Sequence, residues 1–134
     1  MDRRIAVVFL LGAFALTNAY AKKYPFTAST AVPAARGKVD IGKDSNGNTT
    51  VKITAEHLAE PGKLSPPGTD YVVWFQEKGS EPQTQGRLRI DKNLKGNFET
   101  STPLKNFDIF VTAESNASTK QPAGTEVFRT TVQQ

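Results

Sequence analysis

The chain has 134 residues, in which 17 Lys and Arg stand against 13 Asp and Glu, with one His, one Trp and no Cys. The absence of Cys excludes disulfides, and a single His excludes structural zinc and cupredoxin-type copper sites, which need several Cys or His ligands. The net charge of +4 is spread along the sequence, so the chain lacks the dense basic face that nucleic-acid binding requires. We therefore expect one domain with its own hydrophobic core and no cofactor.

The N-terminus has the pattern of a secretory signal peptide. Arg3 and Arg4 precede an apolar run over residues 5–16, and Ala19–Tyr20–Ala21 is a cleavage site of the A-x-A type. The run is shorter than the ~20 residues of a membrane-spanning helix. We expect a signal peptide over residues 1–21, export to the periplasm or the extracellular space, and no membrane span after cleavage. An uncleaved N-terminal anchor is the alternative.

The next segments predict a tether followed by a hairpin. Residues 22–35 are small, contain proline and show no periodicity, which favours a flexible tether before a domain over residues 36–134. Apolar and polar residues alternate over 36–44 and again over 49–56, as in half-buried strands. The Asn–Gly dipeptide between them is typical of a tight turn.

The domain is expected to be built around residues 70–76, DYVVWFQ, which contain the only tryptophan. Residues 57–69 precede this segment and hold three Pro and two Gly, so they predict a crossing loop. The β-branched and aromatic composition of 70–76 favours a strand, and its continuous apolar character indicates that both faces are covered.

Four further strands follow from the same patterns. They are expected over residues 85–91, 98–100, 105–114 and 125–132. Seven short strands separated by turn signals predict an all-β, antiparallel, two-sheet β-sandwich of the immunoglobulin-like type.

One aromatic face is a candidate binding surface. Val72 and Trp74 point away from the main apolar face of their strand, and Phe110 does so on the strand over 105–114. An exposed aromatic row of this kind would suit a carbohydrate-binding module. Buried aromatics are the more common arrangement in a small sandwich, and we favour core positions for these rings.

A second candidate surface is the edge of the last strand. A terminal strand often has one free side, which can pair with a partner protein. We therefore name Val127, Arg129 and Thr131 as a candidate pairing edge.

The sequence carries no catalytic or calcium motif. His57 is the only candidate base, and no serine stands in a G-x-S-x-G context, so we expect no enzymatic activity. Asp44, Asn46 and Asn48 alternate like the first ligands of an EF-hand loop, but Thr49 and Ala55 occupy the positions that need Gly and Glu. A hairpin turn explains these residues better.

Several segments resemble the C-terminal extracytoplasmic domain of bacterial anti-sigma-K-type factors. The resemblance lies in Tyr71–Trp74, Gly86–Leu88, Val111–Glu114 and Pro122–Gly124. It implies a β-rich fold outside the cytoplasm. Sigma-factor binding is not implied, because a signal peptide stands where those factors have a sigma-binding domain and a transmembrane helix.

These observations predict an exported, non-enzymatic β-sandwich of the bacterial envelope with a protein-interaction or sensory role. The partner is an unidentified envelope protein or polymer, and nucleic acid is excluded. A carbohydrate- or polymer-binding module is the alternative function.

Overall fold

The computed structural model describes residues 22–134, which form nine β-strands and one short 3-10 helix. The seven predicted strands are all present, as β3 to β9. The bounds are β1 (Lys22–Pro25), β2 (Thr27–Ala28), β3 (Arg36–Lys43), β4 (Thr49–Glu56), η1 (Pro61–Lys63), β5 (Asp70–Gln76), β6 (Gln83–Ile90), β7 (Gly96–Thr102), β8 (Phe107–Glu114) and β9 (Thr125–Val132).

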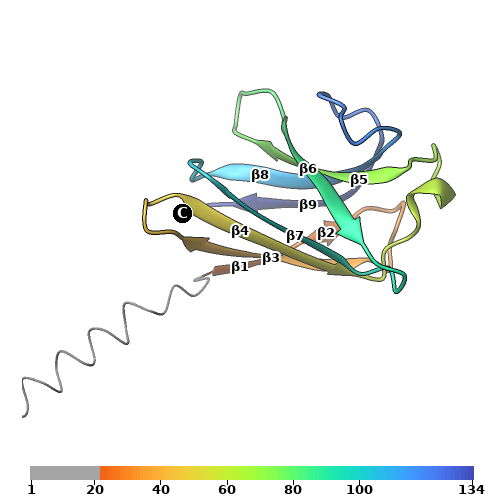
Figure 1. Ribbon diagram of the computed structural model, residues 1–134, viewed down its shortest axis with the longest axis horizontal. Coiled ribbons are helices and arrows are strands. Elements are labelled where there is room, and N and C mark those ends of the chain that lie inside the picture. The colour runs from red at the N-terminus through yellow and green to blue at the C-terminus, as the bar shows by residue number, and fades with distance from the viewer. Residues whose placement is uncertain (1–21) are drawn as a thin grey trace, which may run out of the picture.

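The strands form one antiparallel sheet that nearly closes on itself. Their order is β1-β3-β4-β7-β6-β5-β8-β9-β2, and the first and last strands of this order are neighbours along the chain. Figure 1 shows β6 passing from the layer of β5, β8 and β9 to the layer of β3, β4 and β7. The all-β antiparallel prediction is confirmed. The two-sheet, immunoglobulin-like sandwich of about seven strands is wrong, because the fold is a barrel-like sheet of nine strands.

Residues 22–35 differ from the predicted tether, because they contain the two strands that close the barrel. In β1, Tyr24 pairs with Val39 of β3, and in β2, Thr27 pairs with Arg129 of β9. Phe26 lies between these strands and stacks on Phe128, with ring centroids 4.8 Å apart. These residues form strands because they pair with β3 and β9, and their own sequence shows no alternation of apolar and polar residues. The predicted signal peptide lies outside the described residues.

The barrel interior holds the main hydrophobic core. Alternation along each strand sends one set of side chains inward, and the predicted inward sets of β3, β4, β5 and β8 are confirmed. Twelve of the core residues belong to these sets: Val39, Ile41, Val51, Ile53, Ala55, Tyr71, Val73, Phe75, Phe107, Ile109, Val111 and Ala113.

A β-bulge in β6 interrupts its pairing with β5. Val73 pairs with Gly86 and Trp74 pairs with Thr84, so Gln85 is an extra residue on β6. Gly86 has φ of 119°, a conformation that L-residues with a side chain rarely adopt. Bulges bend a strand and increase its twist. The bulge lies in the part of β6 that pairs with β5, over residues 83–88, and β6 pairs with β7 only at Arg89 and Ile90.

Burial of Tyr71 predicts a loss of stability at alkaline pH. Tyr71 is 1% exposed and its hydroxyl donates to the carbonyl of Ala59 at 2.6 Å. Burial raises the pKa of Tyr71 from 10.0 to about 12. A raised folded-state pKa favours the neutral form, so its contribution is complete below pH 10 and is lost as the pH rises toward 12. We expect this loss to reach about 2–3 kcal/mol.

Urea denaturation across this pH range measures the effect. Below pH 10 the Tyr71→Phe variant should be less stable than the parent, because the Ala59 carbonyl loses its donor. It should lack the alkaline decline, so the difference should shrink as the pH rises. An equal decline in Tyr71→Phe and the parent protein would assign it to other groups.

Candidate functional site

The predicted aromatic face lies on the outer side of β5, β8 and β9. The strand register places Trp74, Phe110 and Arg129 in one row across these strands. The rings of Trp74 and Phe110 are stacked, with centroids 6.2 Å apart and an interplanar angle of 16°. The guanidinium carbon of Arg129 lies 4.3 Å from the centroid of Phe110, in a cation–π contact.

This face is buried rather than open. Val72, Trp74 and Phe110 form their own hydrophobic cluster, separate from the barrel core, and are 0%, 0% and 3% exposed. A sugar-binding platform needs ring faces that a ligand can reach. The three candidate binding residues therefore lie together, as the alternation predicted, but they present no open aromatic surface.

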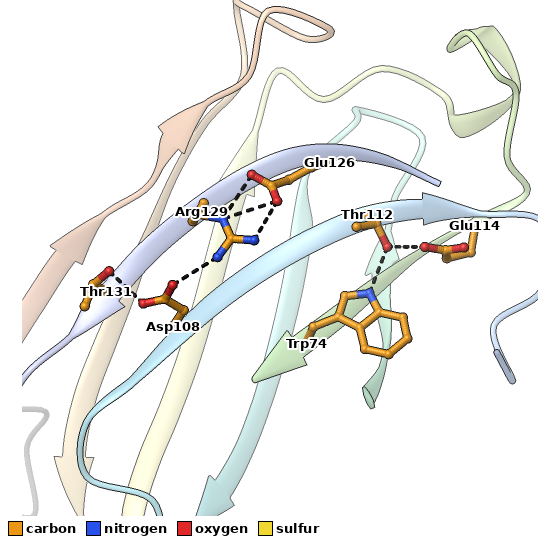
Figure 2. A network of polar contacts seen from close by, with 7 residues as sticks. All are labelled: Trp74, Asp108, Thr112, Glu114, Glu126, Arg129 and Thr131. Atoms are coloured by element: carbon orange, nitrogen blue, oxygen red, sulfur yellow. Dashed lines mark hydrogen bonds and ion pairs between the residues drawn. The ribbon is translucent and has the colours of Figure 1, made fainter. Parts of the chain in front are cut away.

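Arg129 is held over Phe110 by two carboxylates (Figure 2). Its guanidinium donates to Glu126 at 2.8 Å and to Asp108 at 3.0 Å. Thr131 donates its hydroxyl to the other oxygen of Asp108 at 2.8 Å. Hydrogen bonding to Glu126, with a smaller effect of Asp108, raises the pKa of Arg129 above its ordinary value. The network holds the cation on the ring between two carboxylates.

A second network anchors the loop between β8 and β9. The indole Nε1 of Trp74 donates to the hydroxyl of Thr112 at 2.8 Å, and this hydroxyl donates to Glu114 (Figure 2). The buried Glu114 carboxylate also accepts the backbone N–H groups of Ala123 and Gly124. Glu114 was missed by the sequence analysis. Its signal is a carboxylate at the last residue of a buried strand, followed by a long polar loop.

The predicted pairing edge of β9 is partly covered. β2 pairs with β9 at Phe128 and Arg129, and the carbonyl of Val127 accepts the N–H of Ser29 at 3.0 Å. Thr131 lies beyond this pairing. Of the candidate edge residues Val127, Arg129 and Thr131, the first two are thus next to a segment of the same chain.

Longer open strand edges occur between β6 and β7. These strands form only the pairs Arg89–Asn97 and Ile90–Gly96. In β6, residues 83–88 pair with β5 on one side and have no strand partner on the other side within the described chain. In β7, residues 98–102 pair with β4 on one side and likewise have no strand partner on the other. Two backbone edges therefore diverge from the hairpin that joins them.

The calcium-like segment from Asp44 to Asn48 forms a hydrogen-bonded hairpin turn. The Asp44 carboxylate accepts the N–H groups of Asn46 and Asn48, both at 2.9 Å, and the Asn48 hydrogen bond contributes most to lowering the pKa of Asp44. Gly47 has φ of 80°, as the predicted hairpin turn requires. Residues 22–134 contain no group of His, Cys, Asp and Glu that could hold a metal ion. His57 lies directly after β4.

In the same residues, no helix has the length and apolar character needed to cross a bilayer. Comparisons with protein families, with curated proteins and with solved structures find no match for this chain.

Proposed function

We propose that this protein is an exported, non-enzymatic interaction module of the bacterial envelope. In this proposal it binds an extended segment of a partner protein along the open edges of β6 and β7. The single observation that carries the proposal is the pair of unpartnered strand edges beside the Gln85–Gly86 bulge. The N-terminal pattern and the resemblance to an extracytoplasmic domain support export.

The chemistry of the edge indicates an extended polypeptide as the ligand. Asp91 donates its N–H to the carbonyl of Lys95, and Arg89 pairs with Asn97. Backbone groups alternate sides along a strand, so those of Arg87 on β6 and Glu99 on β7 point to the side where the partner strand is missing. An added strand supplies the matching N–H and C=O groups, which is how β-augmentation gains affinity.

The charged side chains of this edge do not bridge the opening. Arg87 and Glu99 are opposite charges at positions that would pair if the ladder continued, yet the guanidinium of Arg87 binds Asp70 of β5 at 3.2 Å. Both residues are exposed. Neither Lys nor Pro, which protect many natural edges, occurs in β6 or β7.

Replacing Glu99 with proline tests the proposal. Proline removes the backbone N–H that faces the opening and is tolerated on the free side of an edge strand. We expect Glu99→Pro to weaken binding of the partner segment about tenfold or more. The matched control is Glu99→Ala, which loses the same charge but keeps the N–H, and should bind nearly as well as the parent protein.

The experiment uses a photo-crosslinking residue at Ser101, followed by mass spectrometry of the crosslinked peptides from the host envelope. One defined segment should be recovered with the parent and with Glu99→Ala, but not with Glu99→Pro. Equal crosslinking by both variants would contradict the edge as the site. Crosslinking of Ser101 to a polysaccharide in place of a protein segment would favour the alternative function.

A further inference from the structure

We infer that the outer face of β3, β4 and β7 binds an anionic polysaccharide. This surface borders the β6–β7 opening at Gly96 and Asn97 but does not depend on the proposed function. Its central feature is a shallow hollow of about 480 Å³. The hollow is lined by Arg36, Gly37, Lys38, Thr54, Ala55, Glu56, Lys95, Gly96 and Asn97.

The strand register explains the shape of the hollow, which we call the cationic furrow. Gly37, Ala55 and Gly96 lie in one row across the three strands. Side chains alternate between the two faces of a sheet, and Ala55 belongs to the interior core, so the outer side of this row is bare backbone. The row spans three strands about 4.8 Å apart, which makes a furrow roughly 10 Å long.

Cations stand on both walls of the furrow. Lys38, Thr54 and Asn97 form one row beside it, and the pair Arg36–Glu56 with the neighbouring Lys95 forms the other. The three cations are exposed. Lys38 is 3.6 Å from Asp40, whereas Arg36 and Lys95 take part in no ion pair among residues 22–134.

The lining combines three cations with a carboxylate, a hydroxyl and an amide, and this combination favours one kind of polyanion. Three cations favour a chain with repeated negative charges. The hydroxyl of Thr54 and the amide of Asn97 suit hydroxyl groups, and the carboxylate of Glu56 accepts them as donors while opposing densely charged phosphate chains. A polyuronate, in which each sugar carries one carboxylate and several hydroxyls, matches this set.

Other anionic partners match the furrow less well. Single-stranded nucleic acid is held by aromatic side chains that stack on its bases, and no aromatic residue lines the furrow. A lipid surface needs apolar side chains to insert, and Ala55 is the only apolar residue with a side chain in the lining. An acidic peptide offers few hydroxyl donors for Glu56.

Binding of alginate oligomers to the full chain, measured by isothermal titration calorimetry, tests the inference. The furrow variant carries Arg36→Gln, Lys38→Gln and Lys95→Gln. Exposed ion pairs are each worth a few-fold in affinity, so we expect the furrow variant to bind roughly 10- to 100-fold more weakly than the parent protein. Added sodium chloride should weaken binding to the parent protein.

The control variant carries Lys43→Gln, Lys78→Gln and Lys120→Gln, which remove the same charge from exposed positions outside the furrow. It should stay within roughly twofold of the parent, and neutral dextran should not bind. Equal losses in the two variants would reduce the effect to overall charge and overturn the inference. The inference would also be overturned if alginate did not bind, or if polyglutamate, polyphosphate or anionic lipid vesicles bound more tightly than alginate. Glu99 does not line the furrow, and the furrow variant keeps Glu99, so the two proposals are tested by separate substitutions and fail independently.

Discussion

Replacing Gly124 with alanine is expected to destabilise the protein by at least about 3 kcal/mol. A Cβ atom at this position would stand 1.6 Å from the carbonyl oxygen of Ala113 and 2.7 Å from its carbon. These are backbone atoms of β8, where Ala113 pairs with Tyr71 of the central strand. Relief of the overlap must therefore shift either the ladder or the loop whose Gly124 N–H binds Glu114.

Urea denaturation followed by the fluorescence of Trp74, the only tryptophan, measures the loss. Gly62→Ala is the matched control, because a Cβ there would meet only the carbonyl of Gly68 at an ordinary 3.8 Å. We expect Gly62→Ala to unfold within about 0.5 kcal/mol of the parent protein. Similar midpoints for Gly124→Ala and Gly62→Ala would show that the β8–β9 loop adjusts freely.

Truncating Trp74 to alanine is expected to cost about 3–5 kcal/mol, the range found for large aromatic residues removed from cores. Trp74 is fully buried although it lies outside the barrel interior. The change removes its stacking on Phe110 and the N–H that Thr112 accepts. The second hydrophobic cluster would then consist of Val72 and Phe110 alone.

Trp74→Phe separates the two contributions. It keeps an aromatic ring against Phe110 and removes the N–H donor, so we expect a smaller loss of about 1–3 kcal/mol. Far-UV circular dichroism during urea denaturation provides the measurement, since these variants lack the fluorophore. A loss below about 1 kcal/mol for Trp74→Ala would indicate that this outer face contributes little packing energy.

Local alternation was sufficient to predict the strands with a clear two-sided pattern. Residues of β4 alternate between apolar and polar side chains, and the Asn46–Gly47 turn precedes them, so the hairpin and the facing of its side chains followed from the sequence. The separation of Val72, Trp74 and Phe110 from the interior set followed from the same rule. These features depend on neighbours only a few residues apart.

The barrel could not be predicted in this way because its closure depends on distant partners. β1 and β2 are short and lack alternation, and their strand character comes from β3 and β9. The same omission made β9 look like a free edge. Gly86 was read as part of a regular strand, so the bulge in β6 was missed.

The candidate sites show the same limit. Arg36, Lys38 and Lys95 are spread along the sequence, and their charges looked like an ordinary solvated surface. Pairing of β3 with β4 and of β4 with β7 places them around one furrow. Likewise, the bond between Glu114 and the N–H of Gly124 depends on how the loop returns to β8.

Closure by the first described strands has a consequence for the order of folding. The pair Thr27–Arg129 joins positions about a hundred residues apart, and β9 is synthesised after the other described strands. Contacts of such high sequence separation form late, because the entropy of the long loop is lost before the contact contributes. The hairpins of β3–β4 and β5–β6 can therefore form during synthesis, whereas β1 and β2 must wait for the whole domain. Until then, the strands that they later cover remain open to other chains.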